Sequence, residues 1–138
     1  MWETKHSQVT DVDTDRLWST FEAIHSGRIT LPGGDIFRPK GPLDVGTEIE
    51  VTPAGQDTMI SKIVEFVPGS RYADETEFNG LVLRFAHQFN EVDGGTKITH
   101  QLTISGDGAD HVGPEIGPQI SDDFPEQMDA LIAEARHA

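Results

Sequence analysis

Residues Leu81 to Gly106 read LVLRFAHQFNEVDGGTKITHQLTISG, and more of the architecture follows from them than from any other segment. Apolar and polar side chains alternate on both sides of Asp93-Gly94, which is typical of two half-buried strands joined by a two-residue turn. Asp-Gly is a preferred type I′ turn sequence, and such a turn fixes which residues face each other. The segment therefore predicts a β-hairpin with these facing pairs: Phe85 with Leu102, His87 with His100, and Phe89 with Ile98.

The composition excludes several classes of function. The 24 acidic and 10 basic residues give a formal net charge of −14, which would repel phosphate backbones and anionic lipid surfaces, so we expect no nucleic-acid partner. No stretch approaches the roughly 20 apolar residues that cross a bilayer, and the first residues lack the pattern of a signal peptide, so we expect no stable membrane insertion and a cytoplasmic protein. The absence of cysteine excludes disulfides, thiolate nucleophiles and cysteine-ligated metals.

Turn signals divide the rest of the 138 residues into short elements of one predicted domain, residues 1–138. We expect a first strand over residues 2–9, a helix capped by Asp13, and a second short segment, helical or irregular, over residues 28–34. Strands follow at about 36–40, 46–53, 57–67 and 70–78, before the hairpin. Consecutive strands with tight turns predict an antiparallel meander.

The C-terminal region predicts one long closing helix. Apolar residues recur there at steps of three and four, at Ile116, Ile120, Phe124, Met128, Leu131, Ile132 and Ala135. Pro118 and Pro125 do not suit a helix interior, so we expect a late start, a kink, or a break near Pro125. The apolar stripe must cover the concave face of a curved sheet, because no other element is long enough.

In this order and spacing, the chain resembles the polyketide cyclase/dehydrase and lipid-transport family of the START and birch-pollen-allergen-like (SRPBCC) superfamily. The motifs that carry the resemblance span nearly the whole chain, at residues 11–21, 41–47, 64–71 and 87–99. It implies an α+β helix-grip fold: a curved antiparallel sheet of six or seven strands around a long C-terminal helix, with two short helices after the first strand. It implies no shared catalytic residues, because a ligand cavity unites the family and fold alone does not give function.

The facing histidines, His87 and His100, have three interpretations. As structural residues they would hydrogen-bond each other or a strand neighbour. As polar groups of a cavity they would orient a ligand carbonyl or hydroxyl. As an acid–base pair or metal site they would need further groups, and a facing pair lacks the third ligand that zinc requires. We expect no metal and no cofactor. His6 approaches the pair if the first strand pairs with the last, as it does in the family.

These interpretations predict the binding of a small hydrophobic or amphipathic ligand, such as a lipid, polyketide or aromatic metabolite, between the sheet and the C-terminal helix. Trp2 or the loop at 107–113 would control access. The predicted ligand contacts are Phe85, His87, Phe89, Ile98, His100, Leu102, Ile120, Phe124 and Met128.

Two alternative functions remain open at this level. One is an aromatase/cyclase-type enzyme in which a cavity histidine moves a proton; it requires a second acid–base group, for which Tyr72 and Glu65 are weak candidates. The other is a regulatory or stress-response module whose acidic surface binds a protein partner. Neither the oligomeric state nor the presence of catalysis follows from the sequence.

Overall fold

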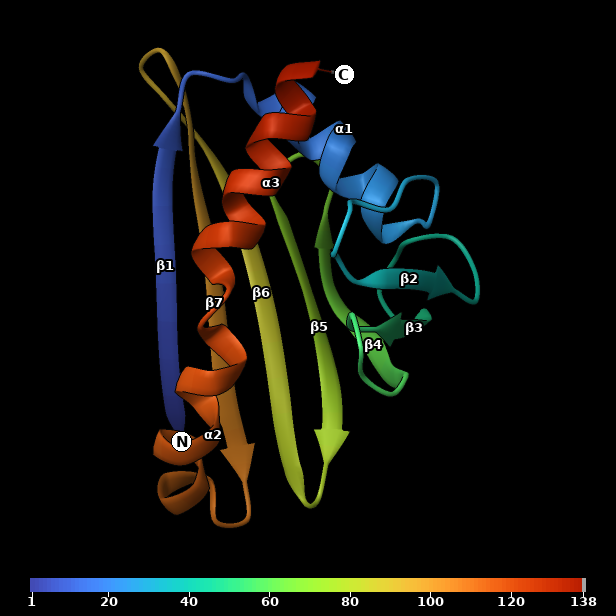
Figure 1. The fold of residues 1–138 in the computed structure, drawn as a ribbon, viewed down its shortest axis with the longest axis vertical. Coiled ribbons are helices and arrows are strands. Elements are labelled where there is room, and N and C mark those ends of the chain that lie inside the picture. The colour runs from blue at the N-terminus through green and yellow to red at the C-terminus, as the bar shows by residue number, and fades with distance from the viewer. Residues whose placement is uncertain (138) are drawn as a thin grey trace.

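A computed structural model describes residues 1–137 of the chain as a seven-stranded antiparallel sheet with three helices on its concave face (Figure 1). The strand order across the sheet is β1-β7-β6-β5-β4-β3-β2. The elements are β1 (Trp2–Thr10), α1 (Thr14–His25), β2 (Ile36–Pro39), β3 (Glu48–Thr52), β4 (Met59–Val67), β5 (Arg71–Phe78), β6 (Leu81–Val92), β7 (Gly95–Gly106), α2 (Ala109–Ser121) and α3 (Phe124–His137). None of the helices within residues 1–137 is long and apolar enough to cross a bilayer.

The predicted register of the hairpin is confirmed. β6 and β7 pair so that Phe85 faces Leu102, His87 faces His100 and Phe89 faces Ile98. The turn type was predicted wrongly: Gly94 has a φ of 80°, but Asp93 is not among the residues with positive φ, which a type I′ turn needs at both positions. The type I′ combination occurs instead at Asn79 and Gly80, where φ is 49° and 80°. Asparagine enters the left-handed region more readily than most residues that have a Cβ.

A single helix follows the first strand, so the prediction of two short helices is wrong. Asp13 caps α1 as expected, accepting a hydrogen bond of 2.9 Å from the backbone N–H of Arg16. The helix ends at Ser26 and Gly27, whose φ of 82° lies in the left-handed region. The segment that follows is irregular up to β2, because Pro32 and the two glycines after it do not support a helix.

The closing helix is divided into α2 and α3 at Asp122 and Asp123, which confirms the break expected near Pro125. Both helices run along the side of the sheet formed by β1, β7 and β6, with α1 beside α3 (Figure 1). They cover two separate apolar clusters. The upper cluster, around Trp18, Phe89 and Met128, packs against α1 and α3. The lower cluster, around Leu83, Leu102 and Phe124, packs against α2.

Trp2 fixes the position of α2. Its indole lies against Gly113 and Gly117, one helical turn apart, and a methyl group at either glycine would overlap Trp2 atoms. The two glycines therefore let the helix approach β1 more closely than any larger residue would allow. Trp2 therefore packs β1 against α2 in this structure.

Replacing Gly117 by alanine tests this packing. Alanine favours a helix over glycine by about 1 kcal/mol, yet we expect Gly117→Ala to lower the free energy of unfolding by about 1–3 kcal/mol, because the methyl group must displace Trp2. The measurement is chemical denaturation. Gly41→Ala is the matched control, since the nearest atom to its new methyl group is 4.0 Å away. A Gly117→Ala variant as stable as the parent would show that the contact is not close in solution.

Candidate functional site

A row of polar side chains crosses the concave face of the sheet. β1 pairs with β7 so that His6 faces His100, and the row continues through His87 on β6 to Tyr72 on β5. Side chains of one face occupy alternate positions in each strand, so the pairing brings all four to the same face. The two histidines in the middle of the row contact both apolar clusters, His87 through Phe21 and His100 through Phe124, which places their polar groups in largely apolar surroundings.

His87 and His100 contact each other edge to face, with ring centroids 4.0 Å apart and an angle of 84° between the rings. Three of their nitrogens are buried and have no hydrogen-bond partner among residues 1–137: Nδ1 of His87 and both ring nitrogens of His100. The structural interpretation required hydrogen bonds at these atoms, and the geometry does not supply them. Each such unpaired group costs about 1–3 kcal/mol.

His6 differs from these two histidines because it is hydrogen-bonded. Its Nε2 lies 2.9 Å from Oε1 of Gln8, and the Gln8 amide donates to Oδ1 of Asp129 on α3 at 2.9 Å. β1 does pair with β7, which was the condition for His6 to approach the pair, and the register sets His6 opposite His100. The His6 ring, however, already has a partner.

His25 is a member of the cluster that the sequence interpretation missed. It lies on the last turn of α1, is 7% exposed, and its Nδ1 is 3.1 Å from the carbonyl oxygen of Phe21. Its ring stacks between Phe21 and Phe37, at 4.0 and 4.2 Å, and lies 5.7 Å from His87. The signal was present, because His25 follows Leu17 and Phe21 at steps of four on the buried face of the helix.

Asp74 is the second missed residue. It is 5% exposed, two positions after Tyr72 on β5, and Oδ2 accepts a hydrogen bond of 2.8 Å from the Tyr72 hydroxyl. No ion pair among residues 1–137 includes it. Burial raises the pKa of Asp74 to about 6, although the Tyr72 hydrogen bond opposes the rise. Burial also raises the pKa of Tyr72, and the charge of Asp74 adds to the effect.

Glu65 does not reach this face of the sheet. The register of β4 against β5 shifts between Ile63 and Glu65, so that Phe66 takes the position facing Tyr72. The Glu65 carboxylate instead lies 3.7 Å from Arg71 and 3.7 Å from Arg84 on the opposite face. Of the two weak acid–base candidates, only Tyr72 is therefore near the histidines.

The buried histidines are neutral at pH 7. Burial lowers the pKa of His25 to about 4 and that of His100 to about 3, with repulsion from His25 and His6 adding to the effect at His100. Burial, and then the neighbouring His100 and His25, hold the pKa of His87 well below its usual range. Each neutral ring carries one N–H donor and one acceptor nitrogen. Within residues 1–137, no three potential metal-binding side chains are arranged to hold an ion.

The nine predicted contact residues differ in their exposure. Five apolar ones and His100 are buried, whereas solvent still reaches Phe85, His87 and Ile120. Those three belong to β6 and the end of α2, beside the break between α2 and α3. The buried apolar residues are Phe89, Ile98, Leu102, Phe124 and Met128.

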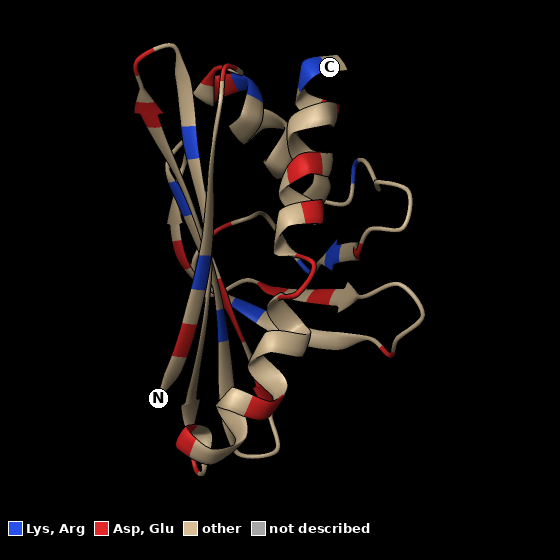
Figure 2. Ribbon diagram, turned by 60° about the vertical axis from the view of Figure 1, so that its left-hand side comes forward, with Lys and Arg blue, Asp and Glu red and all other residues tan. Residues whose placement is uncertain are grey.

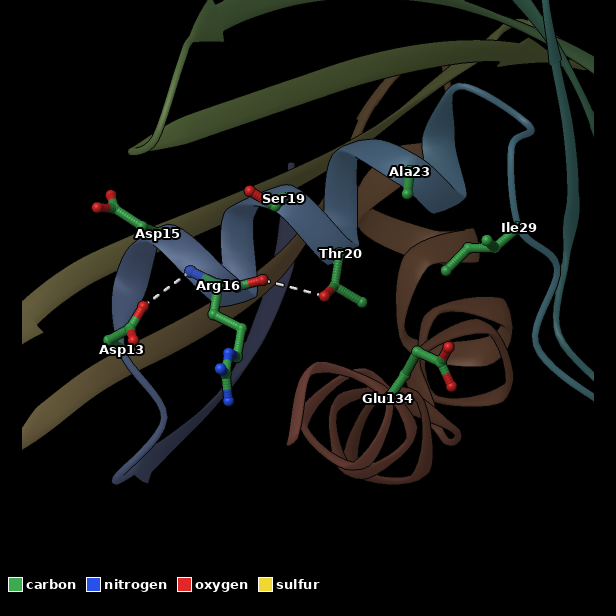
Figure 3. Close-up of a pocket in the computed structure, with 8 residues that line it drawn as sticks. All are labelled: Asp13, Asp15, Arg16, Ser19, Thr20, Ala23, Ile29 and Glu134. Atoms are coloured by element: carbon green, nitrogen blue, oxygen red, sulfur yellow. Dashed lines mark hydrogen bonds between the residues drawn. The ribbon is translucent and has the colours of Figure 1, made fainter. Parts of the chain in front are cut away.

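Two open hollows within residues 1–137 lie away from the histidine cluster. One of about 540 Å³ is an open groove between α1 and α3, and another of about 460 Å³ lies between the loops before β2 and after β3. Figure 3 shows the first, where the Asp13 carboxylate and the Thr20 hydroxyl already hydrogen-bond the backbone of Arg16 within α1. Within residues 1–137, the buried side-chain nitrogens and oxygens without a hydrogen-bond partner all belong to His87 and His100, so we place the candidate site there.

The histidine cluster predicts acid sensitivity. Unfolded histidine binds a proton below about pH 6.5, but folded His25 does so only near pH 4, so stability falls as the pH drops between these values, by about 3 kcal/mol for this residue. Asp74 acts in the opposite direction between pH 6 and 4, because its carboxyl is more easily protonated in the folded state. The three buried histidines have a larger combined effect than the one carboxyl, so the free energy of unfolding decreases as the pH falls.

Unfolding free energies at pH 7, 6 and 5 measure this balance. Between pH 6 and 5, we expect His25→Phe to reduce the loss of unfolding free energy by about 1 kcal/mol per pH unit. Asp74→Asn is expected to increase this loss by a similar amount. His111→Gln is the control, since His111 is exposed on α2. Identical slopes in all four proteins would contradict the assignment of buried neutral histidines.

Comparison with known proteins supports the fold. No protein-family model and no curated protein matches the sequence. Among solved structures, Ara h 8.0201 is similar over 99% of both chains, with a TM-score of 0.78 and 17% identity. Norcoclaurine synthase of Thalictrum flavum is similar over 99% of this chain and 94% of its own, with a TM-score of 0.68 and 14% identity.

A third similar structure has two domains. The di-domain ARO/CYC protein BexL matches 99% of this chain and 49% of its own, with a TM-score of 0.71 and 14% identity. At sequence identities this low, what the chains share is their fold. The protein therefore has the helix-grip fold, as the resemblance of its sequence implied.

Proposed function

We propose that the chain binds a small amphipathic molecule on the concave face of the sheet, between β6, β7 and the helix break. The observation that carries this proposal is the set of three buried imidazole nitrogens without partners at His87 and His100. A ligand carbonyl, hydroxyl or amine would satisfy groups that otherwise cost about 1–3 kcal/mol each. The partly exposed Phe85 and Ile120 beside them would contact the apolar body of the ligand.

The energetics favour a ligand that is mostly apolar. Burying about 200 Å² of apolar surface contributes roughly 5 kcal/mol before the costs of association. The polar contacts then fix the orientation of the ligand rather than supply most of the affinity. The two-cluster arrangement suits this division, because apolar side chains lie on both sides of the histidines.

The similar structures agree with a small-molecule site in this fold. Norcoclaurine synthase was solved with a transition-state analogue, and BexL is an ARO/CYC protein of a biosynthetic pathway. Their low identity to this chain transfers no residue role. Norcoclaurine synthase supports the proposal as a protein of this architecture that accommodates an organic ligand.

An enzyme is the second candidate, because the structure supplies an acid–base group near the histidines. Tyr72 and Asp74 share a hydrogen bond, and the ring of Tyr72 lies 5.8 Å from that of His87. Burial raises the pKa of Asp74 to about 6, close enough to neutrality for proton exchange, whereas burial holds the pKa of His87 well below its usual range. Turnover of the bound molecule would separate an enzyme from a carrier.

Purification from the native host without denaturation tests the main proposal. The organic extract of the pure protein is analysed by mass spectrometry, and we expect one apolar or amphipathic compound in near-stoichiometric amount. An extract that stays empty after incubation with a library of lipids and aromatic compounds would contradict a binding function and favour a protein-binding regulatory module.

The variant His100→Phe separates function from stability. It removes two unpartnered nitrogens, so we expect unchanged or higher stability, by up to about 1 kcal/mol, together with a tenfold or greater loss of affinity for the retained compound. His100→Leu serves as a second variant if phenylalanine overfills the site, and exposed His111→Phe is the matched control. Full affinity in a folded His100 variant would exclude His100 from the site.

A further inference from the structure

Within residues 1–137, the concave face carries no lysine or arginine side chain. Nine of the ten lysines and arginines are exposed, and the tenth, Arg84, lies 3.7 Å from Glu65 and 3.6 Å from Glu75 on the opposite face. The strand alternation explains this arrangement: Lys5, Lys62 and Lys97 each neighbour an inward residue and therefore point outward. A carboxylate or phosphate on the concave face would meet no fixed positive charge there.

The charged groups that do approach this face are acidic. Asp74 is buried on it without an ion-pair partner among the residues described, and it faces Phe85 on β6, a side chain that solvent still reaches. Asp35 is half-buried two residues before Phe37, whose ring stacks on His25, and Asp123 lies at the helix break close enough to repel the Asp35 carboxylate. Beyond this face, Figure 2 shows acidic bands on α2 and α3, most of whose carboxylates are exposed, with basic colour on these two helices only at the end of α3.

Aromatic rings line the same region. Phe21 contacts Tyr72, Phe89 and His87 at centroid distances of 5.3, 5.2 and 4.9 Å, and Phe124 lies 5.6 Å from His100. Aromatic faces attract cations, and the attraction strengthens when water is excluded. The region therefore combines aromatic rings, the Asp74 carboxyl without an ion-pair partner, and neutral imidazole acceptors. This combination suits a ligand group that is positively charged and carries N–H donors.

We infer that the ligand is an aryl-alkyl amine, bound as its ammonium ion with the N–H groups directed to Asp74 and a concave-face imidazole. This inference rests on the proposed function, because it specifies the ligand of the same site. A cation would give the buried carboxyl the partner it lacks, and an uncompensated buried charge is costly. A carboxylate of the same shape would meet repulsion from Asp74 and from a net charge of −14.

Three probes with one ring system separate the possibilities: 2-(2-naphthyl)ethylamine, 2-(2-naphthyl)ethanol and 2-naphthylacetate. Isothermal titration at pH 7.5 compares their affinities for the full chain. We expect the amine to bind about tenfold or more tightly than the alcohol, since a hydrogen bond to a charged group is stronger than a neutral one, and the carboxylate to bind most weakly.

Asp74→Asn identifies the group responsible. The amide keeps an acceptor for the Tyr72 hydroxyl and removes a buried charge, so we expect the variant to fold, with an amine affinity that falls about tenfold more than the alcohol affinity does. Asp57→Asn, on an exposed loop, is the control. A second readout needs no variant: the carboxyl carbon resonance of Asp74 reports its ionisation at pH 6, and we expect the amine to increase the ionised fraction.

The results of these experiments distinguish a failure of the amine assignment from a failure of the proposed binding site. Equal or tighter binding of the alcohol or the carboxylate, with loss on His100→Phe, would overturn the amine assignment and leave the site standing. Amine binding that is insensitive to both Asp74→Asn and His100→Phe would overturn both, since a surface ion pair would then explain it. Failure of all three probes to bind would contradict the amine assignment for this ring class.

Discussion

The antiparallel pairing of β6 with β7 in a single register is the constraint on which the concave face depends. It sets His87 opposite His100 and Phe89 opposite Ile98, and β1 and β5 then extend the same rows on either side. A slip of one residue would turn every side chain of a strand to the other face. The apolar clusters under α2 and α3 prevent such a slip, because Leu102 and Ile104 would then be exposed.

The buried histidines on this sheet lower the stability of the folded protein. Most of the concave face follows the rule that buried groups are apolar or hydrogen-bonded: Thr14 and Thr96 share a hydrogen bond of 2.8 Å, and His25 contacts the Phe21 carbonyl. His100 follows neither rule, with 5% exposure and two unpartnered nitrogens. Departures of this kind concentrate at functional sites, where stability is lost in exchange for a group that a ligand can use.

Much of the fold could be predicted because its signals are local. Asp93-Gly94 between alternating strands gave the hairpin register, Asp13 gave the start of α1, and Pro125 gave the break before α3. The exceptions concern backbone details, since Gly94 alone takes positive φ in its turn and the segment before β2 stays irregular.

The site was harder to predict because its membership depends on distant segments. The pattern of α1 places His25 on its buried face, but it does not reveal the partners of the ring on distant strands, Phe37 on β2 and His87 on β6. Asp74 lies in the charged segment RYADETEF, which has the polarity of a solvated strand. Tyr72 and Asp74 of this segment face inward because of how β5 pairs with its neighbours. These are β4, whose register shifts, and β6.

The central claim is that His87 and His100 are neutral, unpartnered and available to a ligand, and imidazole ¹⁵N NMR tests it most directly. The account predicts that between pH 7 and 5 both rings of the ligand-free protein remain neutral, without the shifts of hydrogen-bonded nitrogens, and that a bound amphipathic molecule changes the acceptor nitrogen of at least one ring. Protonation of His100 near pH 6, or hydrogen-bonded shifts already present in the free protein, would contradict it.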